Sequence, residues 1–88
     1  MINKSIIYVD KKNPERVVPL LVQTASRYDS SITFTRREKT ANVKSIMGML
    51  NFGLISGEPI EVQIDGEDEK EAMEQIESFL TASKLSEE

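Results

Sequence analysis

The sequence predicts an α+β fold of two layers, in which helices cover a β-sheet, with the element order β-α-β-β-α-β-α. Two observations support this prediction. Four segments have the apolar and β-branched pattern of strands with one inward face. Two longer segments have apolar residues at helical spacing and can cover that face, and a short apolar segment after Ser45 supplies a third helix. We expect residues 1–88 to form one domain.

The first 30 residues are expected to form a strand and then a helix. Residues 2–9 combine β-branched and aromatic side chains and end at a polar turn. Helical spacing follows at Val17, Leu20, Leu21, Thr24, Ala25 and Tyr28. Because Pro19 lacks a backbone N–H, it fits only the first turn of this helix. The helix should therefore begin at residue 17 or 18 and end near Tyr28.

The middle of the chain contains three further strand segments. Residues 31–36 alternate strictly, which predicts a half-buried strand with Ile32 and Phe34 inward. A polar turn then leads to a short strand over residues 40–43. The last strand, over residues 60–64, alternates again and follows a turn that contains glycine and proline.

The segment between these last two strands is unusually apolar for a loop. Ser45 precedes a short helical pattern, where its hydroxyl would accept a hydrogen bond from a free N–H of the first turn. One side of that helix would carry Ile46, Met47 and Leu50. The core would receive Met49, Phe52 and Leu54. Because a chain of 88 residues has no deep interior, we expect the first set to form an exposed patch.

The final helix is expected to start after Asp68. This residue can serve as its N-cap, and Glu71, three residues later, would complete a pair resembling a capping box. The apolar stripe of the helix, which we expect in the core, is Ala72, Met73, Ile76, Phe79 and Leu80.

The composition excludes several classes of function. The chain has no cysteine and no histidine, which removes disulfides, thiolate catalysis, phosphohistidine chemistry and the commonest metal ligands. We therefore expect a cytoplasmic protein that is not an enzyme and has no cofactor or metal site. No apolar run approaches membrane-spanning length. The nine basic residues up to Lys44 are dispersed over the predicted elements, so we expect no direct binding to nucleic acid.

Three segments together resemble HPr, the phosphocarrier family of the bacterial sugar phosphotransferase system. Residues 22–29 are similar to the second half of that family's first helix, and residues 66–72 to the entry of its last helix. The family's regulatory-serine segment resembles Lys44-Ser45-Ile46-Met47-Gly48, with Leu50 and Gly53. The resemblance covers nearly the whole chain. It implies the HPr-like open-faced sandwich, with a four-stranded antiparallel sheet and three helices on one face.

The residue that carries phosphate in HPr has no counterpart in this chain. In that family a histidine at the start of the first helix holds the phosphate, and an arginine two residues later contacts it. Matching residues 22–26 without a gap places Pro14 at the histidine position and Arg16 at the arginine position. Matching the family's helix proline to Pro19 instead places Arg16 at the histidine position. In either register there is no imidazole, so we expect no phosphocarrier activity.

The regulatory serine of the HPr family does have a counterpart in this chain. Ser45 matches the residue that the ATP-dependent HPr kinase/phosphorylase modifies, and the pattern is similar to Crh, the branch of the family that lacks the carrier histidine. The resemblance implies control by phosphorylation at Ser45 and a corepressor role with a LacI/GalR-type regulator in carbon catabolite repression. The partner-binding residues that it implies are Arg16, Lys44, Ile46, Met47 and Leu50.

The same residues have other interpretations. Ser45 can be only an N-cap, Arg16 only a solvated charge, and Ile46 and Met47 can lie under a loop. An alternative function is an unphosphorylated binding module that docks a metabolic enzyme or another partner through this helix. Because Crh-type chains exchange their first strand, the expected assembly is either a monomer or a strand-swapped homodimer.

Overall fold

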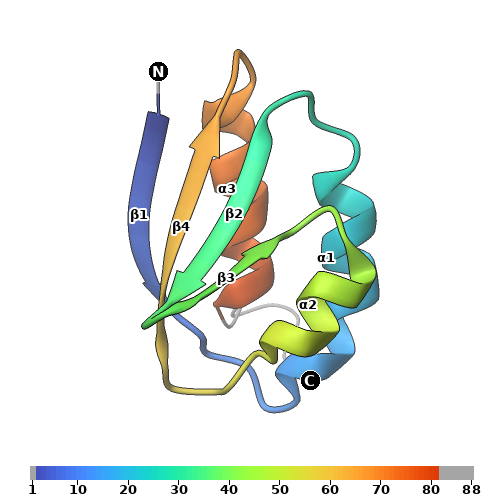
Figure 1. Cartoon of the computed structure of the whole chain (residues 1–88), viewed down its shortest axis with the longest axis vertical. Coiled ribbons are helices and arrows are strands. Elements are labelled where there is room, and N and C mark those ends of the chain that lie inside the picture. The colour runs from blue at the N-terminus through green and yellow to red at the C-terminus, as the bar shows by residue number, and fades with distance from the viewer. Residues whose placement is uncertain (1, 82–88) are drawn as a thin grey trace.

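The structure, a computed structural model, describes residues 2–81. Its elements, shown in Figure 1, follow the predicted order, with strand ends that differ from the expected bounds by a residue. They are β1 (Ile2–Tyr8), the 3₁₀ turn η1 (Pro14–Val17), α1 (Val18–Ala25), β2 (Ser31–Arg36), β3 (Lys39–Asn42), α2 (Ile46–Phe52), β4 (Pro59–Asp65) and α3 (Glu69–Leu80).

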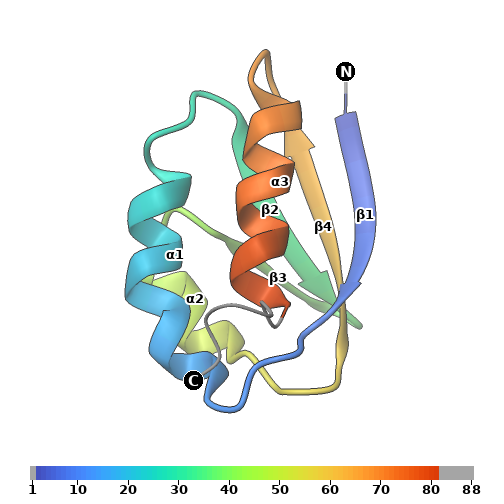
Figure 2. The same cartoon turned by 180° about the vertical axis from the view of Figure 1, so that it is seen from behind.

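The four strands form one antiparallel sheet in the order β1-β4-β2-β3. Helices α1 and α3 lie side by side over one face of this sheet (Figure 2), and the opposite face is open. Helix α2 packs against β3 and α1. The predicted α+β open-faced sandwich is therefore confirmed.

The core lies between the sheet and the helices. Ile32 and Phe34 of β2 point inward, as their alternation predicts, and are at most 1% exposed. The predicted stripe of α3 is also confirmed, because its buried residues are Ala72, Met73, Ile76 and Leu80, while Phe79 packs at the margin of the core. Burial of these apolar surfaces from both layers supplies the main driving force for folding.

Helix α1 starts where Pro19 requires but ends earlier than predicted. Its first residue is Val18, and its last is Ala25 rather than a residue near Tyr28. In the turn that follows, the N–H of Arg27 donates to Thr24 at 3.1 Å and the N–H of Tyr28 donates to Ala25 at 3.2 Å. These bonds span three residues, as in a 3₁₀ turn. The apolar spacing therefore continues beyond the regular helix.

The predicted capping box of α3 is wrong. Asp68 occupies the N-cap position, but its carboxylate turns away from α3 and accepts a hydrogen bond from the Ser30 hydroxyl. It also accepts from the backbone N–H of Asp29 at 2.9 Å and of Ser30 at 3.0 Å. Glu71 is exposed. Because the α1–β2 loop offers three donors, it competes successfully with the helix for this carboxylate.

The Asp68 contact predicts a stability that depends on pH. The hydrogen bonds from the Ser30 hydroxyl and the Asp29 N–H hold the pKa of Asp68 below its ordinary value of 3.8. The ionised carboxylate therefore stabilises the fold above that value, and the contribution is lost as the pH falls through the lowered pKa. We expect Asp68→Asn to lower Tm most near neutral pH, with the difference from wild type shrinking as the pH falls below 3.8.

The measurement is thermal unfolding by circular dichroism across this pH range. Glu67→Gln is the matched control, because it removes the neighbouring exposed carboxylate and should change Tm little. A difference between wild type and Asp68→Asn that is constant with pH would contradict the assignment.

Candidate regulatory and docking site

Ser45 is the N-cap of α2, as the sequence predicts. Its backbone is extended, with φ −107° and ψ 117°, and its Oγ accepts a hydrogen bond from the N–H of Gly48 at 3.1 Å. Val43, two residues earlier, is fully buried and fixes the entry to the helix. Ser45 is half-buried, and its hydroxyl lies next to the first turn of α2.

Three apolar side chains are exposed beside this serine, and we call them the α2 patch: Ile46 at 41%, Met47 at 69% and Leu50 at 61% exposure. The opposite side of the helix, represented by Met49 and Phe52, is at most 3% exposed. Helix α2 is thus apolar on two sides, one in the core and one in solvent. An exposed apolar cluster of this kind is typical of an interaction site.

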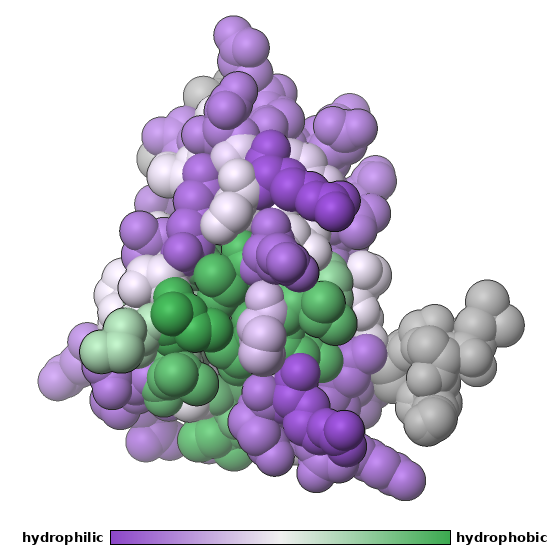
Figure 3. Space-filling model, turned by 90° about the vertical axis from the view of Figure 1, so that its right-hand side faces the viewer, coloured by the Kyte–Doolittle hydropathy of each residue, from purple (hydrophilic) through white to green (hydrophobic). Residues whose placement is uncertain are grey.

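Sequence reasoning missed one exposed apolar residue on the neighbouring helix. Leu20 and Leu21 share the helical spacing that predicts α1, yet Leu20 is 56% exposed, whereas Leu21 is fully buried. The apolar spacing alone does not separate these two residues, because an apolar stripe about 100° wide can include adjacent positions of a helix. Figure 3 views the side of the molecule formed by α1 and α2, where hydrophobic side chains gather in a patch bordered by hydrophilic ones.

The two basic residues of the predicted site lie apart. The Lys44 ammonium donates to the carbonyl of Tyr28 at 2.7 Å, just beyond the C-terminal end of α1. Arg16 is exposed on η1, before the other end of the same helix. The eight residues of α1 span about 12 Å, so the backbone at Arg16 and the carbonyl that Lys44 contacts lie about one helix length apart. Lys44 therefore has a structural contact that the sequence did not indicate.

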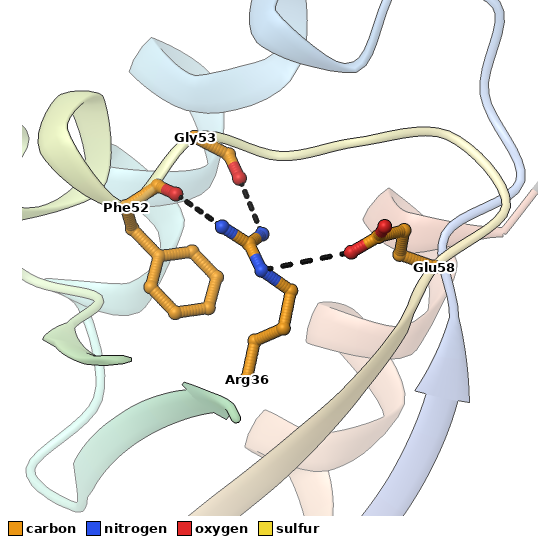
Figure 4. A network of polar contacts seen from close by, with 4 residues as sticks. All are labelled: Arg36, Phe52, Gly53 and Glu58. Atoms are coloured by element: carbon orange, nitrogen blue, oxygen red, sulfur yellow. Dashed lines mark hydrogen bonds and ion pairs between the residues drawn. The ribbon is translucent and has the colours of Figure 1, made fainter. Parts of the chain in front are cut away.

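A third basic residue, which sequence reasoning did not single out, secures the far end of α2 (Figure 4). The guanidinium of Arg36 donates to the carbonyl of Phe52 at 2.7 Å and to that of Gly53 at 2.6 Å. It also lies 3.7 Å from the carboxylate of Glu58 and 4.5 Å from the centre of the Phe52 ring. These carbonyls end α2 and carry its negative dipole, which a cation stabilises. Arg36 is thus a positioning residue for the helix that bears the patch.

A sequence signal for Arg36 existed. It shares the inward alternation phase of Ile32 and Phe34 in β2, and a charged side chain on the inward face requires polar partners. The identity of those partners could not be predicted, because they are backbone atoms 16 and 17 residues away.

These features define a class of protein: an open-faced α+β sandwich that presents a capped serine and an exposed apolar helix face at one edge. The family model described as "PTS HPr component phosphorylation site" matches residues 14–82. The chain belongs to the HPr family of the phosphotransferase system. Proteins of this family are carriers and regulators rather than enzymes.

Solved structures support this assignment. The phosphocarrier HPr of Bacillus anthracis is 30% identical, with a TM-score of 0.86 over 91% of this chain and 98% of that one. The solution structure of Crh, the catabolite repression HPr of Bacillus subtilis, is 28% identical, with a TM-score of 0.73 over 94% and 99%. A crystal structure of Crh as a domain-swapped dimer is 28% identical, with a TM-score of 0.71 over 89% and 90%. Within residues 2–81, none of the helices has the length and apolar character needed to cross a bilayer.

Proposed function

We propose that this chain is an HPr-like regulatory protein without phosphocarrier activity, controlled by kinase phosphorylation at Ser45. It would act as a corepressor partner of a LacI/GalR-type regulator in carbon catabolite repression. The absence of histidine supports the negative part of the proposal. Both candidate carrier positions, Pro14 and Arg16, lie in η1, and neither side chain offers a nucleophile for a phosphoryl group.

The observation that carries the positive part is the position of Ser45 at the N-cap of α2, beside three exposed apolar side chains. A phosphate on Oγ would carry about two negative charges and would meet the free N–H groups of the first turn. It would therefore add charge next to the α2 patch without unfolding the helix. A partner that contacts the patch would then distinguish the two states by electrostatics.

The kinase reaction tests the proposal. With purified HPr kinase/phosphorylase and ATP, we expect one phosphoryl group to pass from ATP to Ser45 Oγ, leaving ADP. The intact mass should rise by one phosphate for wild type and not at all for Ser45→Ala. Ser56→Ala is the control, because it removes another exposed serine and should be modified normally. An unmodified wild-type chain, under conditions in which an ordinary HPr is phosphorylated, would refute the assignment.

The exposure of the α2 patch in the unphosphorylated chain favours a second function, a module that docks a metabolic enzyme or another partner without modification. Affinity capture with wild type and Ser45→Asp separates the two functions. Identical partner sets for the two proteins would favour the unmodified module. A regulator captured only by Ser45→Asp or by the phosphorylated chain would favour the corepressor.

A further inference from the structure

We propose that the thioether of Met47 is a reversible oxidation site that converts the α2 patch from apolar to polar. The inference rests on the proposed docking role of the patch. The chain has no cysteine and four methionines, so methionine sulfur is where a mild two-electron oxidant can react reversibly. Among the methionines that the structure describes, Met47 is 69% exposed, whereas Met49 is fully buried and Met73 is 9% exposed.

The burial pattern makes the reaction selective. A hydroperoxide reacts with a thioether when a sulfur lone pair attacks its outer oxygen. The S–O bond forms, the O–O bond breaks, and water leaves when hydrogen peroxide is the oxidant. Sulfur loses two electrons and the peroxide gains them. Exposure governs access to sulfur, so Met47 should react well before Met49 and Met73.

The product changes the docking surface but not the core. A sulfoxide is polar and carries a strong hydrogen-bond acceptor, whereas the thioether is apolar and adaptable. Met47 is the most exposed of the three side chains of the α2 patch, so any partner covering the patch would bury this new acceptor. Burying an unpaired acceptor weakens binding by about tenfold or more. The core packing of α2 depends on Met49 and Phe52 and should persist.

The first experiment requires no partner. The full chain is treated with hydrogen peroxide, and peptide mass mapping follows each methionine with time while hydrophobic-interaction chromatography reports the apolar surface. We expect Met47 to be oxidised before Met49 and Met73, with earlier elution and an unchanged Tm. Met47→Leu should elute with the untreated protein and should not respond to the same brief treatment. Equal oxidation rates at Met47 and Met49, or unchanged elution with Met47 fully oxidised, would overturn the inference.

The second experiment measures phosphorylation by HPr kinase/phosphorylase, which must contact the surface next to Ser45. Oxidation of Met47 should lower the rate by about tenfold, and methionine sulfoxide reductase with a thiol reductant should restore it. Met47→Gln should imitate the oxidised chain permanently, and Met47→Leu should be insensitive to peroxide. An oxidised chain phosphorylated as fast as the reduced one would refute the switch. If even the reduced chain is not phosphorylated, the proposed function fails, and the chromatographic result still decides the oxidation site.

Discussion

Replacing Arg36 with methionine is expected to lower the free energy of unfolding by about 3 kcal/mol and to loosen the C-terminal end of α2. The Arg36 side chain is 12% exposed, and its guanidinium donates to two carbonyls at the end of this helix. Hydrogen bonds to a charged group contribute about 1.5–3 kcal/mol each, and a carbonyl left without a donor adds a desolvation cost. Methionine retains most of the apolar stem, so the decrease in unfolding free energy reports the contacts of the guanidinium alone. Urea unfolding followed by circular dichroism measures it.

Two further variants make this test specific. Arg37→Met alters the adjacent arginine, which is exposed, and should leave stability within about 0.5 kcal/mol. Arg36→Lys should give an intermediate loss, because an ammonium is a point donor and cannot match the fork of a guanidinium. In Arg36→Met, amide hydrogen exchange should also accelerate over residues 49–53. Equal losses for Arg36→Met and Arg37→Met would contradict the positioning role.

The features predicted correctly from the sequence are those set by short-range rules. The alternation around Ile32 and Phe34 identified the inward face of β2, because side chains in a strand alternate regardless of what packs on them. Pro19 located the start of α1 through its missing N–H. Ser45 identified the start of α2, since an N-cap contacts its own first turn.

The incorrect or missing predictions concern side chains that choose between local and distant partners. Asp68 could cap α3 but instead binds the α1–β2 loop, 38 and 39 residues away. Lys44 could remain in solvent but instead binds the carbonyl of Tyr28. A single sequence shows that these side chains can form hydrogen bonds. It does not identify their partners, because those depend on which loops lie close together in the folded protein. Local propensity was therefore overridden by tertiary contacts at these positions.

The exposed side of α2 keeps a fixed position because contacts on the other sides and at both ends of the helix hold it in place. Ser45 binds its N-terminal turn, Arg36 binds its last carbonyls, and Met49 and Phe52 fill the core. A short helix is marginally stable alone, so these contacts provide its order. The side of α2 that faces solvent is consequently not needed to stabilise the helix. Its apolar residues can therefore be presented to a partner in a fixed arrangement. Preorganised presentation lowers the entropic cost of docking.

Gly66→Ala is expected to cost about 3 kcal/mol, lowering Tm by roughly 15 °C, because a methyl group has no space at this position. A Cβ at residue 66 would lie 2.6 Å from the Cα of Ser30. Ser30 cannot easily move, since it is 1% exposed and Asp68 accepts hydrogen bonds from its hydroxyl and its N–H. The substitution should therefore separate the α1–β2 loop from the start of α3.

Gly57→Ala separates this steric effect from the general cost of replacing a glycine. Gly57 has φ +89°, which disfavours alanine, but a Cβ there would meet no neighbouring atom within 4 Å. Gly57→Ala should therefore lower the free energy of unfolding by only about 1 kcal/mol, through backbone strain. In thermal unfolding, Gly66→Ala should also respond less than wild type to a shift from neutral to acidic pH, because the Asp68 contact would already be broken. Equal decreases in unfolding free energy for the two glycine variants would contradict this prediction. They would show that Ser30 moves aside and that the junction between the loop and α3 is not closely packed.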